Sequence, residues 1–124
     1  MGKEEKKIKS FTDLNTWKEG HKLILMIYKT TESFPDREGF GLTSQMRRCA
    51  VSITSNVAEG FGRKGKKEKI QFYYISLGSI TELQNQLLIA RDIGYLDSKE
   101  FKKIANQTVT VQKITNGLIK SIKK

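Results

Sequence analysis

The sequence predicts an all-α protein that folds as an antiparallel up-down-up-down four-helix bundle. Four stretches space their apolar residues three and four positions apart, which is the period of one helix face. Turns containing glycine or proline separate these stretches, and no stretch has a convincing strand pattern. The turns are short, so consecutive helices are expected to pack as antiparallel neighbours.

The first helix is predicted over residues 13–33. Thr12 or Asp13 is expected to cap its start, and Phe34-Pro35 to end it, because the residue before a proline avoids the α conformation. Leu23, Leu25 and Ile27 fall off its main apolar seam. That predicted seam consists of Leu14, Trp17, His21, Ile24, Tyr28 and Thr31.

The second helix is predicted over residues 43–60, with Gly60 and Gly62 as its terminators. Several of its residues are poor helix formers, so burial is expected to hold it. Ser55 and Asn56 are expected to bond across a helix interface or to a backbone carbonyl. The predicted apolar stripe consists of Leu42, Met46, Cys49, Ile53 and Val57.

The third helix is predicted over residues 66–92 and is apolar over much of its circumference, which is typical of a helix that lies central in the bundle or faces a second partner. Gly78-Ser79 in its middle is expected to leave room for a neighbouring side chain. The predicted stripe consists of Ile70, Tyr73 or Tyr74, Leu77, Ile80, Leu83 or Gln84, and Leu87.

The fourth helix is predicted over residues 97–121, with Asp97 or Ser98 as its cap. Its threonine and valine content lowers helix propensity, so tertiary packing is expected to stabilise it. The predicted stripe consists of Phe101, Ile104, Thr108, Val111, Thr115, Leu118 and Ile122.

A chain of 124 residues suits one domain, and we expect that domain at residues 11–124 after a flexible basic tail at residues 1–10. The lone cysteine, Cys49, cannot form an intrachain disulfide. We expect no signal peptide, because residues 1–9 are mostly charged, and no membrane span, because the longest apolar run is too short. These features predict a cytoplasmic protein.

The net charge of +10 is concentrated in two segments. Residues 62–69 carry five bases against one acid, and residues 113–124 carry four lysines and no acid. Clustered charge of this kind is expected for a polyanion partner, although lysine-rich surfaces also serve solubility alone. The candidate phosphate-binding residues are Arg47, Arg48, Arg63, Lys64, Lys66, Lys67 and Lys69, supported by the terminal lysines.

Two segments carry a family resemblance. They are LTSQMRR at residues 42–48 and SITSNVAEGFGR at residues 52–63, with further matches at residues 72–83, 86–87 and 94–96. Over residues 11–120 the chain resembles the four-helix-bundle family encoded in intervening sequences of bacterial 23S rRNA genes. The family more often has proline at the position of Thr54.

The resemblance implies a bundle that assembles into a cyclic homopentamer. It also implies kinship with the accessory proteins of diversity-generating retroelements, which are basic barrels that bind nucleic acid and a reverse transcriptase. A settled biochemical activity is not implied.

No set of residues predicts an enzyme, a metal site or a cofactor. Glu59 has no second carboxylate, histidine or nucleophile at a supporting spacing, so we expect it to accept hydrogen bonds from an arginine or from helix-end amides. His21 is expected on a seam and Cys49 in the core. The glycine- and lysine-rich segment 60–67 lacks the spacing of a phosphate-binding loop.

Two hypotheses of function follow. The first is an oligomeric RNA- or DNA-binding protein, RNA being favoured, that contacts phosphates without reading sequence. The second is a protein-interaction scaffold whose basic surface only aids solubility or steering, with Phe40, Phe61 and Tyr95 as contact residues. Surplus apolar surface on the first and third helices predicts homo-oligomers.

Overall fold

The computed structural model describes residues 7–124, so most of the expected flexible tail at residues 1–10 lies outside the described residues. Within this range the chain is all-α and contains no strand, as predicted. Its four helices are α1 (Asn15–Thr31), α2 (Leu42–Phe61), α3 (Lys66–Asp92) and α4 (Ser98–Lys123). Two short 3-10 turns, η1 (Phe11–Asp13) and η2 (Asp36–Glu38), precede α1 and α2.

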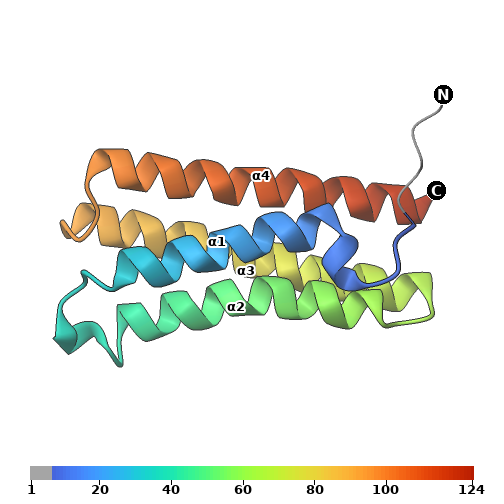
Figure 1. The fold of residues 1–124 in the computed structure, drawn as a ribbon, viewed down its shortest axis with the longest axis horizontal. Coiled ribbons are helices and arrows are strands. Elements are labelled where there is room, and N and C mark those ends of the chain that lie inside the picture. Colours follow the sequence, from blue (N-terminus) through green and yellow to red (C-terminus); the bar gives the residue numbers. More distant parts are fainter. Residues whose placement is uncertain (1–6) are drawn as a thin grey trace.

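The helices form the predicted up-down-up-down bundle (Figure 1). Each helix packs against the next one in the chain, and α4 closes the ring against α1, whereas the backbones of the two diagonal pairs stay farther apart. The turn between α2 and α3 and the end of α4 consequently lie at one end of the bundle, with the start of α1 (Figure 1). The other two connections, residues 32–41 and 93–97, lie at the opposite end.

The core confirms most of the predicted stripes. In α2 the side chains of Met46, Cys49, Ile53 and Val57 are buried. In α3 the two open alternatives resolve to Tyr73 and Leu83, while Tyr74 faces solvent. In α4 the buried set is Ile104, Thr108, Val111, Thr115 and Ile119, with Leu118 half-buried beside it.

The predicted seam of α1 is wrong by about one residue. His21 and Tyr28 are exposed, and Trp17 is half-buried and stacked on His21 with ring centroids 4.8 Å apart. The buried face consists of Thr16, Gly20, Leu23, Ile27, Thr30 and Thr31. Three threonines and a glycine thus occupy seam positions, and Leu23 and Ile27, expected as surplus apolar surface, belong to the core.

The helix starts differ from the predicted caps in two places. Ser10 caps η1, accepting a hydrogen bond from the Thr12 amide while Asp13 reaches back to the Ser10 amide, so α1 itself has no side-chain cap. At the start of α2 the carboxylate of Glu38 accepts from the Leu42 amide at 3.2 Å and from the Tyr95 hydroxyl at 2.8 Å. Glu38 therefore joins both connections at that end of the bundle. The Asp97 cap of α4 is confirmed by its 2.7 Å bond from the Glu100 amide.

Gly60 lies inside α2 and does not terminate it. A Cβ atom at Gly60 would lie 2.7 Å from Cε1 of the buried Tyr73 and 3.0 Å from Cβ of Phe72. Glycine is therefore needed for the close approach of α3, and the helix ends one residue before Gly62. Gly78, expected to receive a neighbouring side chain, faces open space instead, since nothing lies within 4 Å of the position that a Cβ atom would take there.

Polar side chains between α2 and α3 are bonded across the interface. Ser76 donates to the Ile53 carbonyl at 2.9 Å, and the hydroxyls of Ser52 and Ser79 lie 2.8 Å apart. These bonds satisfy groups that would be costly to bury alone. The helix α2 runs unbroken through Thr54, the position where the family more often has proline.

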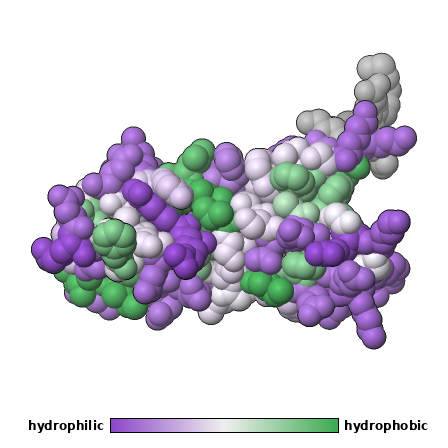
Figure 2. All heavy atoms as spheres, turned by 90° about the horizontal axis from the view of Figure 1, so that it is seen from below, coloured by the Kyte–Doolittle hydropathy of each residue, from purple (hydrophilic) through white to green (hydrophobic). Residues whose placement is uncertain are grey.

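The surface carries several exposed large apolar side chains. Viewed from below, the molecule shows separate apolar areas among hydrophilic residues (Figure 2). Within residues 7–124, no helix is both long and apolar enough to cross a bilayer. The most exposed apolar side chain is Phe40, in the connection before α2, which is fully accessible at 104%.

The close contact at Gly60 leads to a prediction about stability. We expect Gly60→Ala to lower the free energy of unfolding by about 1–3 kcal/mol, because the added methyl group meets a buried ring that has no room to move. Gly78→Ala serves as the matched control in open helix, where it should raise stability by about 0.5–1 kcal/mol. Urea unfolding measures both. Equal midpoints for the two variants would contradict the explanation.

Candidate nucleic-acid interface

The two lysine-rich segments of the sequence lie at the same end of the bundle. The turn after α2 and the last turn of α4 both lie there because α2 and α4 run in the same direction (Figure 1). We call this surface the basic end. It consists of Arg63, Lys64, Lys66, Lys67 and Lys69 from the turn and α3, and of Lys120, Lys123 and Lys124 from α4.

Three cations at the turn and the start of α3 are exposed and unengaged. Lys64, Lys66 and Lys67 form no ion pair or side-chain hydrogen bond among the described residues. The acids nearest in sequence are Glu59 and Glu68, both exposed. The local charge is thus strongly positive, and these three ammonium groups are accessible to a polyanion.

Arg63 is held in place by two contacts. Its guanidinium lies 3.2 Å from the Glu59 carboxylate, one helical turn earlier, and 4.8 Å from the centroid of the Phe72 ring. Exposed pairs of this kind contribute little to stability. In this pair the Glu59 carboxylate is bound by an arginine, as the sequence predicts. Among the described residues, Glu59 belongs to no cluster of acids, histidines and cysteines that would support catalysis.

Lys69 has a structural role. Its ammonium donates to the carbonyl of Phe61 at 2.7 Å and lies 3.4 Å from that of Gly60, so it caps the end of α2. The same group lies 5.4 Å from the centroid of the Phe61 ring. Lys69 is therefore only partly available to a phosphate, although its charge still contributes to the local field.

Arg47 and Arg48 lie far from the basic end. Thirteen or fourteen helical positions separate them from Phe61 at the end of α2, two residues before Arg63, which is roughly 20 Å at 1.5 Å per residue. Arg47 donates to the Thr31 hydroxyl at 2.9 Å and lies 4.7 Å from the Tyr28 ring centroid, so it joins α2 to α1. Arg48 is exposed and lines a shallow pocket with Glu82. The sequence-derived candidate list therefore divides into two separate places.

The polar residues singled out in α2 do not all lie where they were expected. Ser55 is exposed, and Asn56 donates within its own helix, to the Ser52 carbonyl at 2.8 Å. The serine that reaches across to α3 is Ser52. The expected bond to a backbone carbonyl is confirmed for Asn56, whereas the expectation for Ser55 is wrong. Three residues turn a helix by about 300°, so Ser55 lies about 60° away from the face of Ser52.

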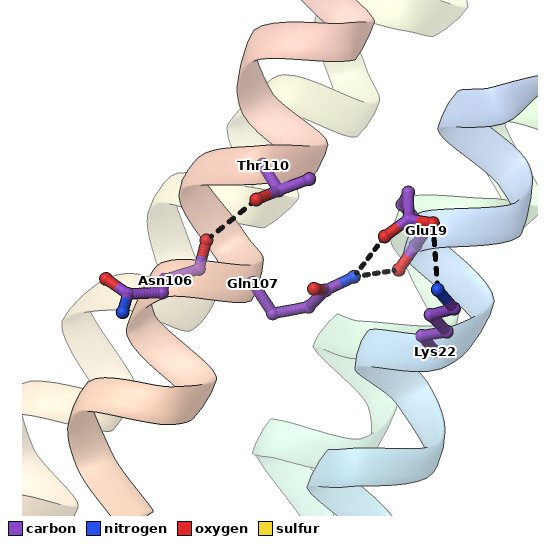
Figure 3. Close-up of polar contacts among 5 residues, drawn as sticks. All are labelled: Glu19, Lys22, Asn106, Gln107 and Thr110. Atoms are coloured by element: carbon purple, nitrogen blue, oxygen red, sulfur yellow. Dashed lines mark hydrogen bonds and ion pairs between the residues drawn. The ribbon is translucent and has the colours of Figure 1, made fainter. Parts of the chain in front are cut away.

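A polar contact between α1 and α4 involves the ionisable residues Glu19 and Lys22 (Figure 3). Gln107 of α4 donates to the backbone carbonyl of Glu19 at 2.9 Å and to its carboxylate at 3.1 Å, and Lys22 pairs with the same carboxylate at 3.2 Å. The bond from Gln107, followed by that from Lys22, lowers the pKa of Glu19 below its usual range. Glu19 thus serves to join two helices.

No grouping of ionisable residues in the described chain points to a reaction centre. Among residues 7–124, no three His, Cys, Asp or Glu side chains gather as metal ligands. Cys49 is buried and lies 3.0 Å from the Ser79 carbonyl. Burial, followed by the nearby Glu82 carboxylate, raises the pKa of Cys49 to about 12, so its reactive thiolate is scarce at neutral pH.

Sequence reasoning gave the terminal lysines a supporting role and left them out of the candidate list. The signal was present, since residues 113–124 carry four lysines and no acid. What the sequence did not show is that Lys120, Lys123 and Lys124 share an end of the molecule with the turn at residues 62–65. That follows from the bundle topology alone (Figure 1).

A family model described as 23S rRNA-intervening sequence protein matches residues 12–117. The chain belongs to this family. The match extends over the whole bundle, from η1 to the last third of α4. Among curated proteins, none matches the chain at a significant level.

A solved structure shows the same fold. It is a protein with unknown function from the S23 ribosomal protein family of Bacteroides thetaiotaomicron. The two structures align with a TM-score of 0.78 at 18% sequence identity, over 85% of this chain and 95% of that chain. At that identity the likeness shows a shared fold and carries no function to this member of the 23S rRNA-intervening sequence family.

The environment of Cys49 leads to a second prediction. At pH 8 we expect the native protein to react with a thiol reagent at least about 100-fold more slowly than the denatured protein, because the thiol is buried and its pKa is raised. The chain has one cysteine, so absorbance from a chromogenic disulfide reagent reports this site alone. Immediate stoichiometric labelling without denaturant would contradict the assignment.

Proposed function

We propose that this protein is a non-enzymatic nucleic-acid-binding protein whose basic end contacts phosphates without reading sequence. The single observation that supports the proposal is that two lysine-rich segments, separated by more than 40 residues in the chain, lie at one end of the bundle (Figure 1). The name of the family ties it to 23S rRNA, so RNA is the first polyanion to test.

The geometry favours a combined field from the two segments. Packed helices lie about 8–10 Å apart, and the Debye length is about 10 Å at 0.1 M salt, so the charges on α3 and α4 act together on an approaching phosphate. Exposed lysines on this surface release counterions on binding, which makes the affinity depend steeply on salt. Contacts of this kind are independent of base sequence.

A protein-interaction scaffold is the second candidate function, and Phe40 is the observation that favours it. This ring is fully exposed in the connection before α2. The other two proposed contact aromatics are engaged within the chain. Tyr95 donates to Glu38 and packs 5.1 Å from the Phe34 ring, and Phe61 lies under Lys69. A protein partner would therefore contact the end opposite to the basic end.

We further propose that the protein is a homo-oligomer, with five subunits by resemblance to its family. The support from the structure is the set of large apolar side chains that the bundle leaves exposed, which includes Leu25, Val51, Ile75, Leu88 and Ile89. Burying such side chains between copies removes apolar surface from water. A ring would repeat the basic end in each subunit and add avidity to weak phosphate contacts.

The phosphate-binding proposal is tested by removing charge at one end only. We expect the triple variant Lys64→Gln, Lys66→Gln, Lys67→Gln to weaken RNA binding at low salt and to reduce the slope of log affinity against log salt by about two to three. Fluorescence anisotropy over a salt series measures both quantities. The matched control is Lys99→Gln, Lys102→Gln, Lys103→Gln, three exposed lysines in the first turns of α4 at the opposite end.

The control variant should retain most of the affinity of the unmodified protein, although its net charge changes by the same amount. Equal losses in the two triple variants would mean that overall charge, and not the basic end, governs binding. Absence of salt-dependent binding in the unmodified protein would contradict the proposal and favour the scaffold.

The oligomer proposal is tested by light scattering coupled to size exclusion. The chain has a mass of 14.2 kDa, and we expect a particle of several times that mass. The variant Ile89→Glu, which places a charge on an exposed apolar position of α3, should lower the particle mass if that face is buried between subunits. A mass of one chain for the unmodified protein would exclude the assembly.

A further inference from the structure

Tyr74 is an exposed aromatic residue beside the basic end. It lies in the first half of α3, and 47% of its surface is accessible. The hydroxyl of Tyr74 accepts a hydrogen bond from the ammonium of Lys123 at 2.8 Å, which places the ring next to the end of α4. An aromatic ring thus lies between the two lysine-rich segments.

The position of Lys123 leaves the faces of the ring accessible. The ammonium lies 2.8 Å from the hydroxyl oxygen but 5.3 Å from the ring centroid, so it approaches the hydroxyl edge of the ring. Among the described residues, no other aromatic ring or cation is stacked on Tyr74. The contact holds the side chain in place without covering it.

The neighbours of Tyr74 along α3 also leave space. Gly78 follows by four residues and has no side chain to cover the ring, and nothing lies within 4 Å of the position its Cβ would take. Ile70, half-buried, and Gln71, exposed, lie one turn before Tyr74, and the exposed Lys67 lies one turn further along the same side of the helix. The side of the ring toward Gly78 is therefore open, and an ammonium group lies about two turns away in the other direction.

The other aromatic residues near this end also have neighbours within the chain. Phe72 lies under Arg63, and Trp17 lies between Phe11 and His21. The Lys69 ammonium lies 5.4 Å from the Phe61 centroid, much as Lys123 lies 5.3 Å from that of Tyr74, so exposure distinguishes these rings. The rings of Phe72, Phe61 and Trp17 are all less exposed than that of Tyr74. Tyr74 is the aromatic side chain of this region that has free surface for an additional partner.

We propose that Tyr74 is a stacking platform for an unpaired base and that the preferred ligand of the basic end is single-stranded nucleic acid. The inference rests on the proposed function, because the lysines supply the phosphate contacts and the ring supplies contact with a base. Bases in a duplex expose only their edges, so an aromatic face can stack only on a base that is unpaired. Stacking tolerates any base, which agrees with binding that does not read sequence.

The experiment compares three ligands of equal length by fluorescence anisotropy at low salt. They are a labelled single strand of about 20 nucleotides without self-complementarity, the corresponding duplex, and an abasic strand that keeps the phosphates, each prepared as RNA and DNA where possible. We expect Tyr74→Leu to weaken binding of the single strand about five- to hundred-fold and to leave binding of the duplex and the abasic strand nearly unchanged.

Two further variants separate stacking from other roles of this residue. Tyr74→Phe keeps the ring but removes the hydroxyl that binds Lys123, and it should bind the single strand like the unmodified protein. Tyr28→Leu is the matched control, since Tyr28 is a similarly exposed ring on α1 that lies beside Arg47, away from the basic end. It should not change binding of the single strand. Circular dichroism checks that every variant retains the helical fold.

The possible failures are distinguishable. If Tyr74→Leu binds the single strand as tightly as the unmodified protein while the Lys64, Lys66 and Lys67 triple variant does not, stacking is overturned and phosphate binding stands. If Tyr74→Phe loses as much affinity as Tyr74→Leu, the hydroxyl contact with Lys123 is responsible and stacking is again overturned. If no ligand binds in a salt-dependent manner, the proposed function fails and this inference fails with it.

Discussion

The structure depends on the close contact between α2 and α3. Gly60 allows the Tyr73 ring to lie against the last turn of α2, and the bond from Ser76 to the Ile53 carbonyl holds the two backbones together farther along. Residues 62–65 form the short turn between the two helices, and the contacts along α2 and α3 set its direction. That turn carries the lysines, so the packing contact determines where the positive charge is presented.

The helices could be predicted from the sequence because their apolar period and turn residues agree. Residues 66–92 were predicted with the bounds observed for α3. The face of α1 could not be predicted, because its seam uses Thr16 and Gly20, which hydropathy does not mark as buried, whereas amphipathic rings at Trp17 and Tyr28 lie on its flank. A glycine occupies a buried helix face when a side chain of a neighbouring helix packs closely against it. Which side chain that is depends on the tertiary structure and cannot be read from the sequence of one helix.

The sequence showed which segments of the candidate site are rich in positive charge. It did not show which of those side chains form one accessible surface. Charge counts identify the segment at residues 62–69 directly. They do not show that Lys69 caps a helix or that Arg47 joins two helices, since these uses depend on carbonyl and hydroxyl groups brought close by folding. The same folding that places Arg47 away from the basic end and engages Lys69 in a helix cap brings Lys123 and Tyr74 together there. A lysine or arginine is available to a ligand when it is exposed and makes no hydrogen bond or ion pair within the protein. Its charge alone does not show this.

The carboxylate of Glu38 gives the opposite end of the bundle a different chemistry. The hydrogen bond from Tyr95, followed by that from the Leu42 amide, lowers the pKa of Glu38, so its contribution to stability is complete above its ordinary pKa and is lost as the pH falls through the lowered value. Protonation would release the start of α2 and the 93–97 connection together. Acidity would thus act on both loops of this end through one carboxylate, whereas ionic strength would act mainly on the end where the lysines gather.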